Sequence, residues 1–163
     1  MRIQHTLGAL TLAGTVAVAT GCGGPKDIEL ADLGITVTAP AGWSVEMARD
    51  SSIGAGSAEL KKDGKTFGFI DAKVVIPFGA DDKAWPKDGA HELSQLQAAF
   101  APLSPEGAES FEGGFGLRYT KKDKAKFFYV VKAGDKELSC TPNDYIDPAD
   151  IPDAISICKS IRG

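Results

Sequence analysis

Few side chains in this sequence have the types and spacing that catalysis requires. Only two histidines are present, and one of them, His5, lies at the start of the chain. The other, His91, falls in a predicted helix two residues before Leu93, about 200° around the axis from the apolar stripe. We expect His91 to face solvent with no nucleophile beside it. The sequence therefore predicts no Ser-His-Asp or Cys-His arrangement and no catalytic residue.

An acidic cluster near the C-terminus has the oxygen ligands that calcium prefers. Its members are Asn143, Asp144, Asp147, Asp150 and Asp153. Their spacing differs from that of an EF-hand loop, which takes ligands at alternate positions around a central glycine. Two of the carboxylates also fall at helix-capping positions. We therefore expect no metal site here, and no zinc site at the cysteines, which have no nearby histidine.

The glycine-rich segments are poor candidates for a cofactor site. Residues 53–57 and 112–116 are not followed by the helix-opening pattern that a phosphate-binding loop needs. The sequence also lacks a Gly-x-Ser-x-Gly nucleophile motif. We expect these glycines to form turns and bulges, and we expect no cofactor.

Two classes of function stay open. The first is a non-catalytic module that binds a partner protein or a small ligand, for which an exposed aromatic patch is the expected feature. The candidate residues for this patch are Trp85, in a polar loop, and Phe67 and Phe69, on the mixed face of a strand. Trp43 begins a strand and is expected in the core.

The alternative is a small hydrolase that works with carboxylates. Its candidate residues are Asp71, Glu92 and Asp144. Such chemistry needs two carboxylates about 5–9 Å apart with separated pKa values. Only a structure can show whether any two of these side chains converge.

The N-terminus is typical of an export signal. Arg2 gives it a positive start, residues 6–19 carry no charge, and small residues follow. The uncharged segment is shorter than the roughly 20 apolar residues that a membrane-spanning helix needs. Its end, Ala19-Thr20-Gly21-Cys22, resembles the lipobox of bacterial lipoproteins, although Ala19 stands where that family usually has leucine.

The lipobox resemblance implies that residues 1–21 are removed and that Cys22 carries diacylglycerol and acyl chains such as palmitate. We therefore expect a lipoprotein of the cell envelope, anchored to the inner or the outer membrane, with its domain in the periplasm or otherwise outside the cytoplasm. Its partner is then an envelope protein or a small ligand. Residues 22–27 are expected to form the lipidated N-terminus and a short tether, and residues 28–163 a single globular domain. The net charge of −4 makes nucleic acid a poor partner.

The sequence has three cysteines, one at the end of the signal and two near the C-terminus. With Cys22 assigned to the lipid, Cys140 and Cys158 are left for each other. The oxidising compartment favours a disulfide between them. The alternative is a pair of buried free thiols.

Alternating apolar and polar residues predict a series of strands. They cover residues 35–38, 43–47, 58–61, 67–76, 114–121, 126–133 and 136–141. A helix is predicted from Asp88 to Pro102, with Leu93, Leu96 and Phe100 as its apolar stripe.

A second helix is predicted at the C-terminus. Asp150 is its expected N-cap, because Pro152 then falls in the first turn, where proline is tolerated. Its predicted buried residues are Ile151, Ala154, Ile155, Cys158 and Ile161.

This order of elements predicts the α+β class, an antiparallel β-sheet with two main helices packed on it. The opening of the domain, an extended segment followed by Ala39-Pro40-Ala41-Gly42-Trp43 and another strand, resembles the PsbP-like and DcrB-like group. The resemblance implies a sandwich of that kind over residues 28–162 and a role as a binding or assembly accessory. It maps no functional residue onto this chain.

Overall fold

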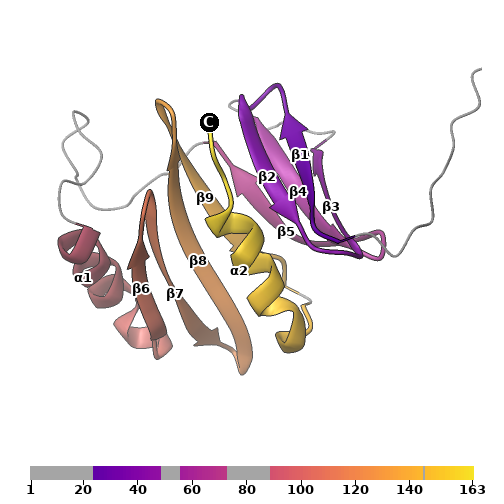
Figure 1. Ribbon diagram of the computed structural model, residues 1–163. Coiled ribbons are helices and arrows are strands. Elements are labelled where there is room, and N and C mark those ends of the chain that lie inside the picture. The colour runs from indigo at the N-terminus through magenta and orange to yellow at the C-terminus, as the bar shows by residue number, and fades with distance from the viewer. Residues whose placement is uncertain (1–23, 49–55, 73–88, 145) are drawn as a thin grey trace, which may run out of the picture.

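Figure 1 shows the computed structural model of the chain, which describes residues 24–48, 56–72, 89–144 and 146–163. The strands are β1 (Lys26–Leu30), β2 (Ile35–Ala39), β3 (Trp43–Met47), β4 (Ser57–Lys62), β5 (Lys65–Asp71), β6 (Glu106–Phe111), β7 (Gly114–Lys121), β8 (Lys124–Ala133) and β9 (Lys136–Pro142). The helices are α1 (Gly89–Phe100) and α2 (Ile151–Lys159), with short 3-10 turns η1 (Ala101–Leu103) and η2 (Pro148–Asp150).

The strands form two antiparallel sheets. β1 and β2 pair with each other, and the other seven strands form one sheet in the order β3-β4-β5-β9-β8-β7-β6. Hairpins join most neighbours, and β9 inserts between β5 and β8. The C-terminal half of the chain thus completes the sheet that the N-terminal half begins.

Each face of the seven-stranded sheet carries its own apolar cluster. On β8, Phe127 and Tyr129 belong to a cluster shared with α2 and the β1–β2 hairpin. Val130 belongs to a second cluster shared with α1. Successive side chains of a strand point to opposite faces. Therefore α2 and the hairpin cover one face of the sheet and α1 covers the other (Figure 1).

The predicted class is confirmed in its coarse form: antiparallel sheets with two helices, and more strand than helix. The predicted strands 35–38, 43–47, 58–61, 114–121, 126–133 and 136–141 are present with small changes at their ends. Two strands were not predicted. β6 has the sequence Glu-Gly-Ala-Glu-Ser-Phe, which lacks apolar alternation, and β1 begins inside the predicted tether.

The expected tether over residues 22–27 is therefore too long at its C-terminal end. Lys26 and Asp27 pair with Ala39 and Thr38 of β2. The Asp27 carboxylate also accepts a hydrogen bond from the Thr38 hydroxyl and forms an ion pair with Arg162. The ordered domain thus begins at least two residues earlier than the sequence indicated.

The helix α1 ends as predicted, because Phe100 is followed by η1, which contains Pro102. The helix α2 also starts where it was expected, directly after Asp150. The capping role differs, however. Asp150 makes no capping hydrogen bond, and its carboxylate forms an ion pair with Lys62. Asp147 instead accepts from the Ala149 amide at the start of η2.

The buried face of α2 is wider than its predicted stripe. Ile151, Ala154 and Cys158 are buried as expected, and Ile157 is fully buried although it was not predicted to be. The helix contacts β8 on one side and β2 on the other, so two of its sides pack against strands. Ile155 is only half-buried. No described helix is long and apolar enough to cross a membrane.

Candidate functional site

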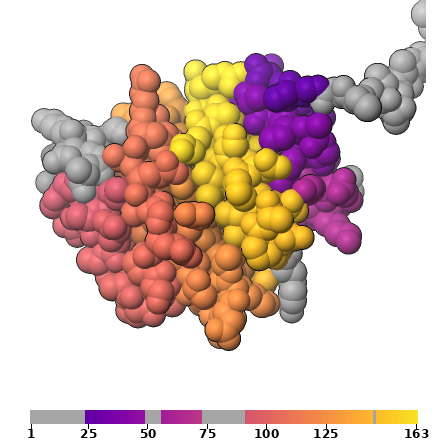
Figure 2. All heavy atoms as spheres, turned by 60° about the horizontal axis from the view of Figure 1, so that its bottom comes forward, coloured from indigo at the N-terminus to yellow at the C-terminus, as the bar shows by residue number. Residues whose placement is uncertain are grey.

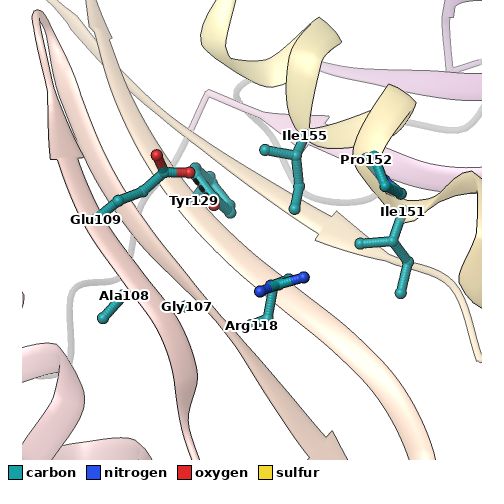
Figure 3. A pocket seen from close by; sticks show the side chains of 8 residues that line it. All are labelled: Gly107, Ala108, Glu109, Arg118, Tyr129, Ile151, Pro152 and Ile155. Atoms are coloured by element: carbon teal, nitrogen blue, oxygen red, sulfur yellow. Dashed lines mark hydrogen bonds between the residues drawn. The ribbon is translucent and has the colours of Figure 1, made fainter.

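A pocket of about 470 Å³ opens between α2 and the β6–β7–β8 end of the sheet. Figure 2 shows this region, where the yellow surface of α2 lies beside the red-orange surface of β6 and β7. β6 contributes Gly107, Ala108 and Glu109, β7 contributes Arg118, β8 contributes Tyr129, and α2 contributes Ile151, Pro152 and Ile155. The pocket therefore has a polar floor of strands and a largely aliphatic wall of helix (Figure 3).

Sheet register brings the polar side chains of the floor together. Glu109 of β6 lies opposite Gly116 of β7, and Gly116 lies opposite Tyr129 of β8. The Tyr129 ring crosses over Gly116, where an added Cβ would come within 2.5 Å of the ring atoms Cγ and Cδ1. The absent side chain at Gly116 thus lets the Tyr129 hydroxyl reach Glu109, to which it donates a hydrogen bond of 2.6 Å.

A lysine from α2 completes this network. Lys159 Nζ donates to Glu109 Oε2 at 2.8 Å and lies 5.3 Å from the centre of the Phe111 ring. The hydrogen bonds from Lys159 and then from Tyr129 lower the pKa of Glu109, so the carboxylate is ionised at neutral pH. Burial raises the pKa of Tyr129, and the Glu109 carboxylate raises it further, so the phenol keeps its proton.

Arg118 lies in a different situation from Glu109. Its side chain is exposed, and among the described residues it has neither a hydrogen-bond acceptor nor an ion-pair partner. The guanidinium passes directly over the backbone of Gly107, where an added Cβ would lie 2.6 Å from Nη2 and 2.7 Å from Nε. A positively charged donor group is therefore presented to the pocket with no hydrogen-bond or ion-pair partner in the described part of the chain (Figure 3).

The shape of β6 makes this approach possible. The β6–β7 register shifts between Glu106 and Glu109, and Gly107 has a φ of +58°. A bulge with a left-handed glycine is a common way to turn a strand locally and redirect its neighbours. Here the bulge brings bare backbone under the Arg118 side chain.

The aromatic residues that were candidates for a partner-binding patch are not together on the surface. Trp85 lies outside the described residues. Phe67 is 5% exposed and packs edge-on against Trp43 with ring centroids 4.9 Å apart, so its assignment to an exposed patch is wrong. Phe69 is half-buried.

The physical reason for the error at Phe67 is a β-bulge. Leu60 pairs with Gly68 and Lys61 with Thr66, which leaves Phe67 as the extra residue between the two pairs. The predicted strand 67–76 corresponds to β5, which ends at Asp71, and residues 73–76 lie outside the described ones. The bulge breaks the alternation at Phe67, whose side chain lies in the core. Trp43 is in the core as expected, with its indole N–H donating to Asp153.

The other candidate residues have separate environments. His91 is exposed on α1, as predicted, and lies 3.2 Å from the Gln95 amide nitrogen. The acidic cluster is spread over distinct partners, since Asp144 pairs with Lys126, Asp147 caps η2 and Asp150 pairs with Lys62.

The carboxylates of the hydrolase alternative belong to three different elements. Asp71 of β5 accepts a hydrogen bond of 2.6 Å from Ser57, Glu92 lies in the first turn of α1, and Asp144 follows β9. The alternative stays an untested prediction.

Cys140 and Cys158 lie beside each other, fully buried, between β9 and α2. The structure describes them as free thiols. Burial raises the pKa of Cys140, and the neighbouring Cys158 raises it further. The predicted pairing of these two cysteines in space is therefore present, and the bond between them stays a prediction. Cys22 lies outside the described residues.

The sequence reasoning did not find Glu109, Arg118 or Tyr129. They lie on three strands and share no motif, so register alone brings them to one place. Gly107 and Gly116 carried the only available signal. Glycine inside a strand often marks a place where another group approaches the backbone closely.

Comparison with known proteins gives a structural likeness and no sequence match. No protein-family model and no curated protein sequence matches the chain. Among solved structures, it is similar to the solution structure of cyanobacterial PsbP (CyanoP) from Synechocystis sp. PCC 6803, with 11% sequence identity and a TM-score of 0.47. The match covers 95% of this chain and 97% of that one. Membership of the group that the opening turn resembles stays a prediction.

Proposed function

We propose that this chain is a cell-envelope lipoprotein, held to a membrane by lipid on Cys22, whose domain is a non-catalytic binding module. The observation that carries the binding role is the pocket between α2 and the sheet. It offers the Arg118 guanidinium, which has no hydrogen-bond or ion-pair partner among the residues that the structure describes, beside an aliphatic helix wall, a combination suited to orienting a ligand.

The same pocket is poorly equipped for acid–base work. The Glu109 carboxylate accepts from Lys159 and Tyr129 at once, and these hydrogen bonds lower its pKa. A general base or acid works best with a pKa near the operating pH, and here the environment moves the carboxyl group away from it. The polar groups therefore favour a role in binding.

The binding role is tested by placing a photo-crosslinking amino acid at Ile155 in the intact cell envelope. Ile155 lies on the pocket wall and is half-buried. The matched control is the same amino acid at His91, which is exposed on α1 on the other side of the sheet. We expect adducts, identified by mass, from position 155 that position 91 does not give. Equal or absent adducts at the two positions would overturn the binding role.

The anchor is tested separately with globomycin, which blocks removal of lipoprotein signals. We expect an acylated precursor that still carries residues 1–21, and we expect the Cys22→Ser chain to show no acylation and no response to the drug. Normal maturation under globomycin would rule out the lipoprotein assignment without touching the pocket.

A further inference from the structure

We propose that the pocket binds a carboxylate carried on a short branched aliphatic group, with the Arg118 guanidinium holding the carboxylate and α2 contacting the aliphatic part. This inference rests on the binding function proposed above and names the chemistry of its ligand. Three features support it: the charges at the pocket, the packing of the Arg118 guanidinium on Gly107, and the aliphatic residues of the α2 wall.

Two positively charged side chains lie at the pocket, and among the described residues only one of them, Lys159, forms an ion pair. Glu109 accepts a hydrogen bond on each oxygen, from Tyr129 at Oε1 and from Lys159 at Oε2. The Lys159 and Glu109 charges offset each other as an ion pair. Arg118 has no such partner among the described residues, and its guanidinium brings five N–H donors in a planar fork. The pocket therefore has unmet donor capacity at Arg118, which forms no ion pair among the described residues and acts on the Glu109 carboxylate only through space.

The guanidinium is seated on backbone and has no side-chain hydrogen bond within the described structure. Gly107 leaves open the space that the Arg118 nitrogens occupy, since an added Cβ would lie 2.6 Å from Nη2. Gly107 also has a positive φ, which glycine adopts at little cost. The donor fork is thus placed by packing and keeps its hydrogen bonds for a ligand.

The wall opposite the fork selects an aliphatic group. Ile151, Pro152 and Ile155 of α2 line it, and none of them offers a side-chain donor or acceptor. Pockets that take small ligands have volumes of roughly 300–1,000 Å³ and combine apolar walls with a few polar groups. A pocket of about 470 Å³ accommodates a branched chain of a few carbons together with its carboxylate.

Glu109 decides between the two anions that a guanidinium binds in a bidentate manner, carboxylate and phosphate. Glu109 lines the same pocket and is held in its charged form. A phosphate monoester brings about 1.5–2 negative charges at neutral pH, whereas a carboxylate brings one. The weaker repulsion from Glu109 favours the carboxylate.

Two kinds of ligand carry these groups: a free branched-chain acid, and a peptide whose C-terminal residue is leucine. The first test uses equilibrium dialysis of labelled 4-methylpentanoate against the full lipidated chain in lipid nanodiscs, with empty nanodiscs as background. We expect wild-type protein to bind 4-methylpentanoate at least about tenfold more tightly than 4-methylpentanamide, a typical worth of a hydrogen bond to a charged group. The Arg118→Gln chain should lose this preference.

A matched pair of glycine variants tests the seating of the guanidinium. Gly107→Ala places a Cβ where Arg118 lies, and a flexible side chain is expected to move away from it. Gly134→Ala imposes the same kind of backbone strain, because Gly134 has a φ of +62° and open space within 4 Å. We expect Gly107→Ala to weaken binding about as much as Arg118→Gln, and Gly134→Ala to leave it within about twofold. Circular dichroism checks that all chains are folded.

Further ligands distinguish a free acid from a peptide C-terminus and test the preference for a carboxylate. Tighter binding of Ala-Ala-Leu with a free carboxylate than of 4-methylpentanoate assigns the peptide end, and the reverse order assigns the free acid. Equal binding of acid and amide, tighter binding of 3-methylbutyl phosphate, or an equal loss in both glycine variants would overturn the carboxylate assignment. Adducts at position 155 that persist in Arg118→Gln would retain the binding function and reject this ligand class.

Discussion

Because Gly116 of β7 has no side chain, a residue of β8 can form a hydrogen bond with a residue of β6. The Tyr129 ring lies over this glycine and carries its hydroxyl from β8 across β7 to Glu109 on β6. A methyl group there would also lie 2.7 Å from the Phe128 carbonyl oxygen. The side chains on either side are already buried or hydrogen-bonded, so the ring has little room to shift.

We expect Gly116→Ala to lower the free energy of unfolding by about 1–3 kcal/mol, because overpacking forces side chains out of preferred rotamers. Urea unfolding measures the loss. The control is a double-mutant cycle in which the same substitution is made in Tyr129→Ala protein. There it should cost clearly less, since the ring that it strikes is gone. An unchanged cost in that background would show that Tyr129 is not the group that Gly116 accommodates.

The charge on Glu109 gives the protein a pH dependence at low pH. Hydrogen bonds from Lys159 and Tyr129 lower the pKa of Glu109 from its ordinary value of 4.5. A group with a lowered folded-state pKa contributes stability that is full above its unfolded pKa and is lost as the pH falls through the folded value. The contribution of Glu109 is therefore present above about pH 4.5 and lost below it.

We expect the urea midpoint of the wild-type protein to fall more steeply between pH 6 and pH 3.5 than that of Glu109→Gln. The amide in that variant does not titrate, so its smaller slope isolates the Glu109 contribution. Glu112→Gln, at an exposed residue of the β6–β7 turn, serves as the control and should follow the wild-type curve. A Glu109→Gln curve parallel to wild type would contradict the assigned network.

At the scale of elements, sequence patterns predicted most strands and both helices because those elements bury one face and expose the other. Alternation in β2 and β3 and the three- and four-residue spacing in α1 are local signals. β6 was not predicted because it is an edge strand with few apolar residues, so its sequence shows no apolar–polar alternation. Its bulge lies at the pocket, and the glycine at position 107 is the only local sign of it in the sequence.

The helix α2 shows the same division between local and long-range information. Its start after Asp150 follows from where proline is tolerated, and this was predicted. Its packing between β8 and β2 depends on strands far away in the sequence, so the burial of Ile157 was missed. Asp150 was expected to cap the helix, but Lys62 of β4, distant in sequence, takes its carboxylate.

A disulfide bond is predicted between α2 and β9, where Cys158 and Cys140 lie. We expect protein isolated from the envelope to have Cys140 and Cys158 joined, so that neither is alkylated after denaturation without a reductant. On the chain-entropy model, such a bond across a loop of this size contributes about 3 kcal/mol. Peptide mass mapping with and without a reductant provides the measurement.

The control is the reduced, folded protein. Because Cys140 and Cys158 are fully buried and burial raises the pKa of Cys140, iodoacetamide should label the native reduced pair much more slowly than the unfolded one. Rapid alkylation of both cysteines in freshly denatured, unreduced protein would show that the pair is not bonded.

At the scale of the whole molecule, the two described ends of the chain meet on β2. β1 pairs along one edge of β2, and Thr36 of β2 exchanges backbone hydrogen bonds of 2.8 and 3.0 Å with Arg162. The Arg162 side chain also forms an ion pair of 2.6 Å with Asp27 of β1. The C-terminal residues therefore tie the hairpin to the end of α2.

We expect a chain that stops at Ile161 to exchange the Thr36 amide proton at least about tenfold faster than wild type, since each lost hydrogen bond contributes roughly 1 kcal/mol or more. Hydrogen exchange followed by NMR gives the rate. A chain that lacks Gly163 alone keeps Arg162 and should exchange at the wild-type rate. Equal rates in all three chains would mean that the β2–Arg162 bridge does not protect that amide.

The bulge in β6 has a consequence beyond the placement of Arg118. β6 is the last strand at its end of the seven-stranded sheet, so its outer edge presents backbone groups that a strand from another molecule could pair with. The left-handed Gly107 interrupts the regular spacing of those groups, and the exposed Glu106 beside it adds negative charge. If Cys22 carries lipid as proposed, copies anchored to the same membrane meet often. The bulge that lies beside the pocket would then also keep neighbouring copies from joining edge to edge.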